Sequence, residues 1–175
     1  MDNLRYPIGK YIVQPFTDIL LQQWLNDIKF LPLHLENAIL NLDDMQLETP
    51  YREGGWTIKQ VVHHVADSHM NAYIRFKLGL TEDKPVIKPY DESAWAEMID
   101  TKKIPINVSL TLLHALHVRW LEILKNMSGS DLEKTVIHPE HKKEMTIWEL
   151  LGMYAWHGKH HVAHITGLRA RMNWG

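Results

Sequence analysis

Two histidines near the end of the chain, His157 and His161, stand four residues apart. On a helix this spacing puts both imidazoles on one face, about one turn apart, where they can share one metal ion. A third candidate, His64, lies far upstream. Three protein ligands leave a metal with an open coordination position, which is typical of catalytic rather than structural sites. The sequence therefore predicts one mononuclear three-histidine site.

The remaining residues exclude several other kinds of functional site. The chain has twelve histidines and no cysteine, so disulfides, thiolate ligands and a cysteine nucleophile are all excluded, and nitrogen and oxygen must hold any metal. The sequence also lacks a His-Glu-x-x-His pair, a Gly-x-Ser-x-Gly elbow, a phosphate-binding glycine loop and the repeated Glu-x-x-His of di-iron bundles. A mononuclear metal site remains.

Helical periodicity ranks the histidines of the last predicted helix. At about 100° per residue, His161 falls within roughly 20° of the centre of the apolar stripe and His157 about 60° to one side. His164 lies about 80° and His160 about 120° from that centre. Burying two imidazoles without a partner costs several kcal/mol, whereas one inward histidine is more often a hydrogen-bonded core residue. The pattern favours His157 with His161 as the inward pair.

The upstream helix carries a polar row. Its members follow one another at about one turn: Gln60, His64, Asp67, Asn71 and Arg75. The row is either a solvated face or the lining of a wet pocket between helices. In the second case His64 is the third ligand, and Asp67 is the candidate for orienting a ligand or taking a proton. His63 is not aimed inward, and His114 with His117 and His138 with His141 are interpreted as structural or surface histidines.

These residues need helices to position them. The first sixteen residues, with Pro7, Gly9 and Pro15, predict an extended arm. Apolar residues at spacings of three and four then predict four helices: from Ile19 to Leu42 with a kink at Pro32, from Thr57 to about Leu80 with His69 on its apolar face, from Ser109 to Met127, and from Thr146 to about Met172. Thr57 with Gln60 and Thr146 with Glu149 have the spacing of capping boxes.

Two segments interrupt the helical pattern. Residues Thr135 to Met145 alternate weakly and predict a short hairpin. Residues Thr81 to Val108 form a long connection with three prolines and Trp95 in a possible short helix; a connection of this length in a compact domain is often functional, so it could wall a pocket. The predicted fold class is all-α: a four-helix bundle with an extended N-terminal arm and a long loop between helices 2 and 3.

Length, charge and hydropathy indicate the class of protein. The 175 residues fit one soluble domain spanning 1–175, and the formal net charge of -2 gives no reason to expect nucleic acid. No apolar run approaches the roughly 18 residues that a membrane span needs, and the N-terminus has no secretory signal pattern. We therefore expect no membrane partner and a cytoplasmic location.

Several motifs together resemble the YfiT-type branch of the DinB-like superfamily. They are Tyr51-Arg52-x-Gly54-Gly55-Trp56-Thr57, the run from Gln60 to Asn71, Lys88-Pro89-Tyr90-Asp91-Glu92, and Trp156-His157-x-x-His160-His161-x-Ala163-His164-Ile165. The resemblance spans nearly the whole chain. It implies a DinB-like four-helix bundle, homodimers, and one divalent metal per chain, nickel or zinc, on His64, His157 and His161.

The resemblance leaves the reaction open. Members of the family are regarded as metal-dependent hydrolases, while related members transfer low-molecular-weight thiols such as bacillithiol to electrophiles. A small-molecule substrate, with or without a thiol cosubstrate, is expected. Hydrolase and thiol S-transferase rank level, and a non-enzymatic bundle in which the metal only stabilises the fold is the alternative. A fourth protein ligand would indicate that structural role.

Overall fold

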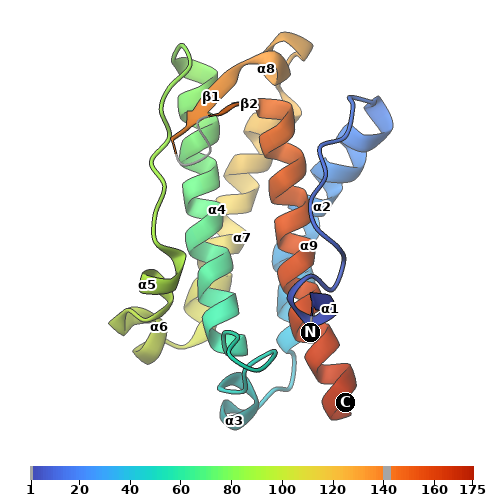
Figure 1. Cartoon of the computed structure of the whole chain (residues 1–175), viewed down its shortest axis with the longest axis vertical. Coiled ribbons are helices and arrows are strands. Elements are labelled where there is room, and N and C mark those ends of the chain that lie inside the picture. The colour runs from blue at the N-terminus through green and yellow to red at the C-terminus, as the bar shows by residue number, and fades with distance from the viewer. Residues whose placement is uncertain (1, 140–142) are drawn as a thin grey trace.

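Four long helices form the body of the molecule. The structure is a computed structural model that describes residues 2–139 and 143–175. The long helices are α2 (Asp18–Ile39), α4 (Ile58–Thr81), α7 (Ile106–Lys125) and α9 (Ile147–Met172) (Figure 1). The predicted all-α four-helix bundle is confirmed. α2 continues through Pro32, and α7 begins three residues earlier than predicted.

The helices do not simply alternate in direction. Each of α2 and α9 runs down the view of Figure 1, whereas α4 and α7 both run up it. The contacting pairs are α2 with α9, α4 with α7, α2 with α7, and α4 with α9. The pairs α2 with α9 and α4 with α7 are therefore parallel, and the other two pairs are antiparallel. The reason is the connection from α4 to α7, which returns along the length of the bundle before α7 begins.

Capping explains where the helices that carry the histidines start. Thr57 accepts from the backbone N–H of Gln60, whose side chain accepts from the Thr57 N–H, and Thr146 and Glu149 make the same exchange. Both predicted capping boxes are confirmed. Two further boxes, not predicted, start the short helices α3 (Asp44–Leu47) and α8 (Gly129–Glu133).

The core has two apolar clusters with histidines between them. The first cluster includes Trp24, Ile28, Phe76, Trp120 and Leu150, and the second includes Leu31, Leu35, Val62, Leu113 and Ile165. On α4, α7 and α9, the residues between the two clusters include His69, His117 and His157. His69 is fully buried, and His117 is nearly so. A layer of imidazoles thus interrupts the apolar core.

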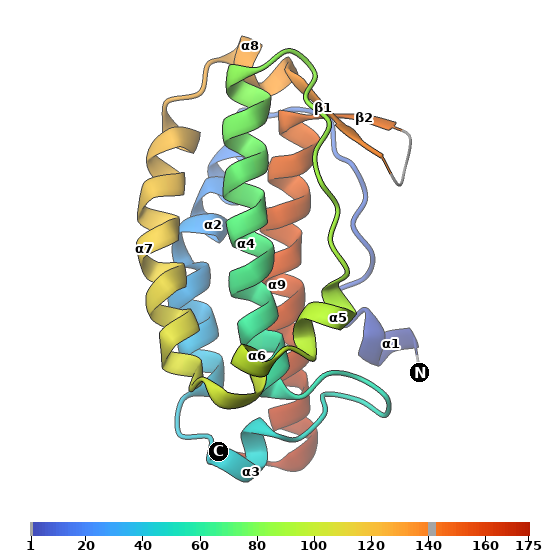
Figure 2. The ribbon, with the colours of Figure 1, turned by 90° about the vertical axis from the view of Figure 1, so that its left-hand side faces the viewer.

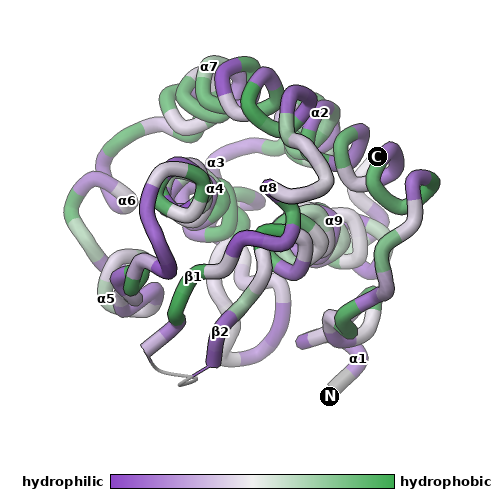
Figure 3. The backbone as a smooth tube through the Cα atoms, turned by 90° about the horizontal axis from the view of Figure 1, so that it is seen from above, coloured by the Kyte–Doolittle hydropathy of each residue, from purple (hydrophilic) through white to green (hydrophobic). Residues whose placement is uncertain are grey.

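Peripheral segments cover one side of the bundle. They are α1 (Asp2–Arg5), α5 (Glu92–Ala96), α6 (Ile99–Lys103) and the antiparallel pair β1 (Thr135–His138) and β2 (Lys143–Thr146). In Figures 2 and 3, α1, α5 and the hairpin lie on the side of α4 and α9, away from α2 and α7. The hairpin and the short helix around Trp95 are confirmed. The arm is extended only in part, because it opens with the helical turn α1.

Hydrogen bonds attach the arm to α9. The indole N–H of Trp156 donates to the Gly9 carbonyl at 3.2 Å, the indole of Trp148 donates to Gln14 at 2.8 Å, and the Tyr11 hydroxyl donates to the Glu149 carbonyl at 3.1 Å. The arm therefore covers a face of α9 that would otherwise meet solvent. No helix in the described part of the chain is long and apolar enough to cross a membrane.

Candidate metal centre

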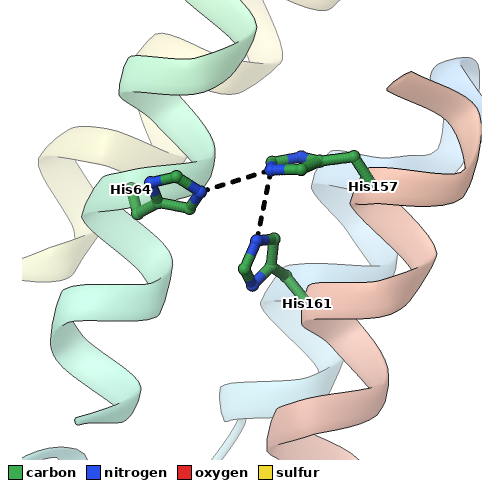
Figure 4. A group of neighbouring side chains, drawn as sticks. All are labelled: His64, His157 and His161. Carbon is green, nitrogen blue, oxygen red and sulfur yellow. Dashed lines mark hydrogen bonds between the residues drawn. The ribbon is translucent and has the colours of Figure 1, made fainter. Parts of the chain in front are cut away.

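Three imidazoles from two helices point at one another (Figure 4). His64 comes from α4, and His157 and His161 come from successive turns of α9. The Nε2 atom of His157 lies 3.2 Å from the Nε2 atom of His64 and 3.2 Å from that of His161. One ligand atom from each ring lies within 4.8 Å of the other two. The structure thus brings together the three residues that the sequence singled out.

The donor set fits a divalent ion such as zinc. Tetrahedral Zn–N bonds of about 2.0 to 2.1 Å place neighbouring nitrogens about 3.3 Å apart, close to the two separations observed. Burial lowers the pKa of His64 to about 4 and that of His157 and His161 well below the ordinary value. The rings are therefore neutral at pH 7, which is the form that binds a metal.

A close helix contact fixes the position of the α9 ligands. Gly158, next to His157, faces Leu31 of α2, and a Cβ atom at Gly158 would lie 2.6 Å from the Leu31 Cδ2 atom. Any larger residue would push the two helices apart or displace Leu31. The glycine therefore lets α9 lie close enough to α2 to hold its histidines at the observed depth.

The three histidines form part of the wall of an open cavity of about 670 Å³. The rest of its lining comes from the arm, the loop before α4, α4 itself, the α4–α7 connection, the end of β1 and α9: Arg5, Tyr6, Tyr51, Arg52, Gly54, Gly55, Trp56, Ser68, Arg75, Pro89, Tyr90, Glu92, Ser93, His138, Met153, Tyr154, Trp156, His160 and His164. The α4–α7 connection does wall a pocket, as predicted. Three arginines and one glutamate among these residues make the cavity attractive to small anions.

The polar row on α4 is divided in the structure. Of its five members, only His64 and Arg75 line the cavity, and the Gln60 amide instead donates to the Ala96 carbonyl and to Glu97. Asp67 lies one turn from His64 but outside the cavity lining. Burial, and then the charge of Asp100, raise the pKa of its carboxyl to about 6. Neither alternative therefore holds for the whole row: His64 and Arg75 line the cavity together with Ser68, whereas Asp67 does not.

The remaining histidines on α9 are buried as well. His164 stacks on Tyr51 with ring centroids 3.9 Å apart, and His160 stacks on Trp156 at 4.5 Å. Helical periodicity predicted that both side chains point away from the core. It could not predict their burial, because the arm and the loop before α4 cover this face of α9. Neither belongs to the group of three converging histidines.

The histidines outside α9 take varied places. His63 points away from the three, with its ring nitrogens 2.8 Å from the Ser109 hydroxyl and 3.2 Å from the Ile104 carbonyl. His114 is half-exposed beside Glu36, whereas His117 is buried. His138 lines the cavity, and His141 lies outside the described residues.

Two buried residues lie beside the three histidines; the sequence assigned no role in the site to His69 and gave Arg75 only a place in the polar row. His69 lies against His157, and Arg75 donates to the Tyr154 hydroxyl at 2.8 Å and to the Lys88 carbonyl at 3.0 Å. The position of His69 on the apolar stripe of α4 could have indicated that it is buried. The position of Arg75 one turn beyond Asn71 could have indicated that it extends the polar row into the pocket.

Comparison with known proteins agrees with the geometry. Proteins of Bacillus cereus strain 03BB102 and Bacillus anthracis strain CDC 684, each named "Putative metal-dependent hydrolase", are 54% identical over 175 residues, covering 99% of this chain and 100% of the relative. The structure of YfiT from Bacillus subtilis, described as a probable metal-dependent hydrolase with an unusual four-helix bundle topology, matches with a TM-score of 0.96 and 46% identity, covering 99% of each chain. Residues 34–165 match the DinB superfamily. The chain belongs to the DinB superfamily.

Proposed function

We propose that this chain is a metal-dependent hydrolase that holds one divalent ion, zinc or nickel, on His64, His157 and His161. The observation that carries the proposal is the convergence of three neutral imidazoles in the wall of an open cavity. Within the described residues this group has three members, so a coordination position is left for a substrate or water. Assembly as a homodimer stays a prediction of the family resemblance, and a cytoplasmic location stays a prediction of the sequence.

The residues of the chain have separable tasks in this proposal. A divalent ion supplies Lewis acidity and lowers the pKa of a bound water or thiol. Arg5, Arg52 and Arg75 attract an anionic group of the substrate, and the aromatic walls limit its access to water. Asp67 stays the candidate from sequence for orienting a ligand or taking a proton, because it lies one turn from His64 on α4 and burial raises its pKa to about 6, although it lies outside the cavity lining.

Transfer of a small thiol to an electrophile is the second candidate. It is supported by the absence of cysteine, which means that any nucleophilic sulfur must arrive as a cosubstrate, and by the arginine-lined cavity, which suits a thiol that carries carboxylates. Both reactions would use the same three ligands.

One comparison tests the site and the reaction together. Wild type, His161→Ala and His63→Ala are loaded with zinc or nickel, and their metal content is measured by elemental analysis. Each is then assayed for hydrolysis of esters and amides, and for conjugation of bacillithiol to a generic electrophile, with metal-free protein as control. We expect His161→Ala to lose metal and activity and His63→Ala to keep both, because only His161 points at the other ligands.

The possible results separate the candidates. Ester or amide hydrolysis supports the hydrolase, and thiol conjugation alone supports the transferase. Equal metal loss in both variants would contradict the ligand assignment. Metal binding that stabilises the protein but supports neither reaction would favour the non-enzymatic bundle.

A further inference from the structure

A chain of hydrogen bonds runs from His157 through the core to the backbone of α2. The Nδ1 atom of His157 lies 3.4 Å from Nε2 of His69, and Nδ1 of His69 lies 3.0 Å from Nε2 of His117. The chain ends where Nδ1 of His117 lies 2.6 Å from the carbonyl oxygen of Ile28. The three rings belong to α9, α4 and α7, so the chain spans the bundle.

The last link sets the direction of the others. A carbonyl oxygen can only accept, so Nδ1 of His117 must carry the proton. Burial keeps the His117 ring neutral, and its Nε2 is therefore a lone pair that accepts from Nδ1 of His69. By the same step Nε2 of His69, whose ring is fully buried, accepts from Nδ1 of His157. His157 is then left with a lone pair on Nε2, which is the atom that faces His64 and His161.

A second, shorter chain starts at the other α9 ligand. Nδ1 of His161 lies 3.4 Å from Nδ1 of His164, whose Nε2 lies 3.1 Å from the carbonyl oxygen of Arg5. The carbonyl again requires the proton on Nε2 of His164, so its Nδ1 accepts from Nδ1 of His161. The lone pair of His161 falls on Nε2. Two independent chains that end on main-chain carbonyls therefore give the same tautomer to both ligands.

We propose that these two histidine relays hold His157 and His161 as Nδ1–H tautomers before any metal binds, so that both Nε2 lone pairs are ready for the ion. His69, His117 and His164 are positioning residues in this account. The inference rests on the metal centre proposed above, and it adds that ligand tautomer is imposed from the backbones of α1 and α2. Histidines that bind a metal generally donate their second ring N–H to a carbonyl or carboxylate. Here the acceptor is another imidazole, whose own tautomer is fixed by the next hydrogen bond in the chain.

His117 is the position at which to test the relay, because it touches none of the three ligands. In His117→Leu the chain loses its acceptor for His69. In His117→Gln the amide carbonyl can accept from His69 while the amide N–H donates to Ile28, which preserves the direction of the chain. His114→Gln, on the exposed side of the same helix, is the matched control. Circular dichroism and thermal unfolding establish that each variant is folded.

Two measurements on the full chain are compared. Nitrogen-15 NMR of histidine rings in metal-free protein reads the tautomers of His157 and His161, and competition with a chromophoric chelator gives the zinc Kd. We expect Nδ1–H for both in wild type, and a mixed tautomer of His157 in His117→Leu with zinc binding weakened about 10- to 100-fold. His117→Gln and His114→Gln should stay close to wild type, and His161 should keep its tautomer throughout.

The outcomes distinguish the relay from the site itself. An Nε2–H tautomer of His157 in metal-free wild type would overturn the relay, and this measurement needs no variant to fold. Wild-type zinc affinity in folded His117→Leu would also overturn it, as would a loss in His117→Gln as large as that in His117→Leu. A wild-type chain that binds no zinc would instead refute the proposed metal centre.

Discussion

Replacing His117 by glutamine should change how the stability of the metal-free protein depends on pH. Burial, partly opposed by the hydrogen bond to the Ile28 carbonyl and reinforced by the charge of His114, lowers the pKa of His117 from 6.5 to about 4. His69 of α4 is the titratable group that faces it from another helix. Since the folded state disfavours the proton, the unfolded chain binds it first as the pH falls.

The sign and size follow from linkage. The stability contributed by neutral His117 is complete above pH 6.5 and is lost progressively as the pH falls toward 4. At 1.36 kcal/mol per pKa unit, the loss is about 2 kcal/mol at pH 5 and about 3 kcal/mol at pH 4. Glutamine cannot titrate. The unfolding free energy of wild type relative to His117→Gln should therefore fall by these amounts between pH 7 and pH 4.

Urea unfolding followed by tryptophan fluorescence measures the difference, with metal removed from both proteins by a chelator. Taking the difference cancels the titration of the other histidines, which both chains share. His114→Gln removes a half-exposed histidine from the same helix and serves as control. A wild-type curve that runs parallel to that of His117→Gln from pH 7 to pH 4 would refute the claim that His117 is buried in its neutral form.

Two further substitutions test other parts of the site. Asp67→Asn should lower the rate of the metal-loaded enzyme about 10- to 100-fold with unchanged metal content, if the carboxylate orients a ligand or takes a proton; an unchanged rate removes Asp67 from the mechanism. Gly158→Ala should lower the unfolding free energy by about 1 to 3 kcal/mol, because the new methyl group would meet Leu31 at 2.6 Å. Gly167→Ala on the same helix meets only the Arg171 side chain at 3.5 Å, and equal destabilisation by both would contradict the packing argument.

Two of the three proposed ligands could be selected from sequence because the signal is local. His157 and His161 sit on one face of a helix whose start is marked by a capping box, and the apolar stripe of that helix says which face points inward. His64 lies in a polar row on its own helix. The inward direction of His157 and His161 depends only on neighbours within a few turns, whereas the polar row left the role of His64 open and the family resemblance singled it out.

The relays could not be predicted because they depend on which helices are neighbours. His69 and His117 meet only because α4 and α7 pack side by side in parallel, and that arrangement follows from the path of the long connection rather than from any local pattern. His164 is buried because the N-terminal arm folds back onto α9 and offers it the Arg5 carbonyl. The position of Asp67 outside the cavity wall could not be predicted either, because segments that are distant from α4 in the chain also form the wall.

The histidine layer also accounts for the division of the core into two apolar clusters. Burying imidazoles at this depth without partners would cost free energy, and the main-chain carbonyl at the end of each relay completes the hydrogen bonding. The same hydrogen bonds leave lone pairs of His157 and His161 facing each other across 3.2 Å, an arrangement that is unfavourable until a cation lies between them. The fold therefore keeps its ligands arranged for a metal at some expense to the stability of the metal-free state, and metal binding should raise the unfolding free energy as well as create the reactive centre.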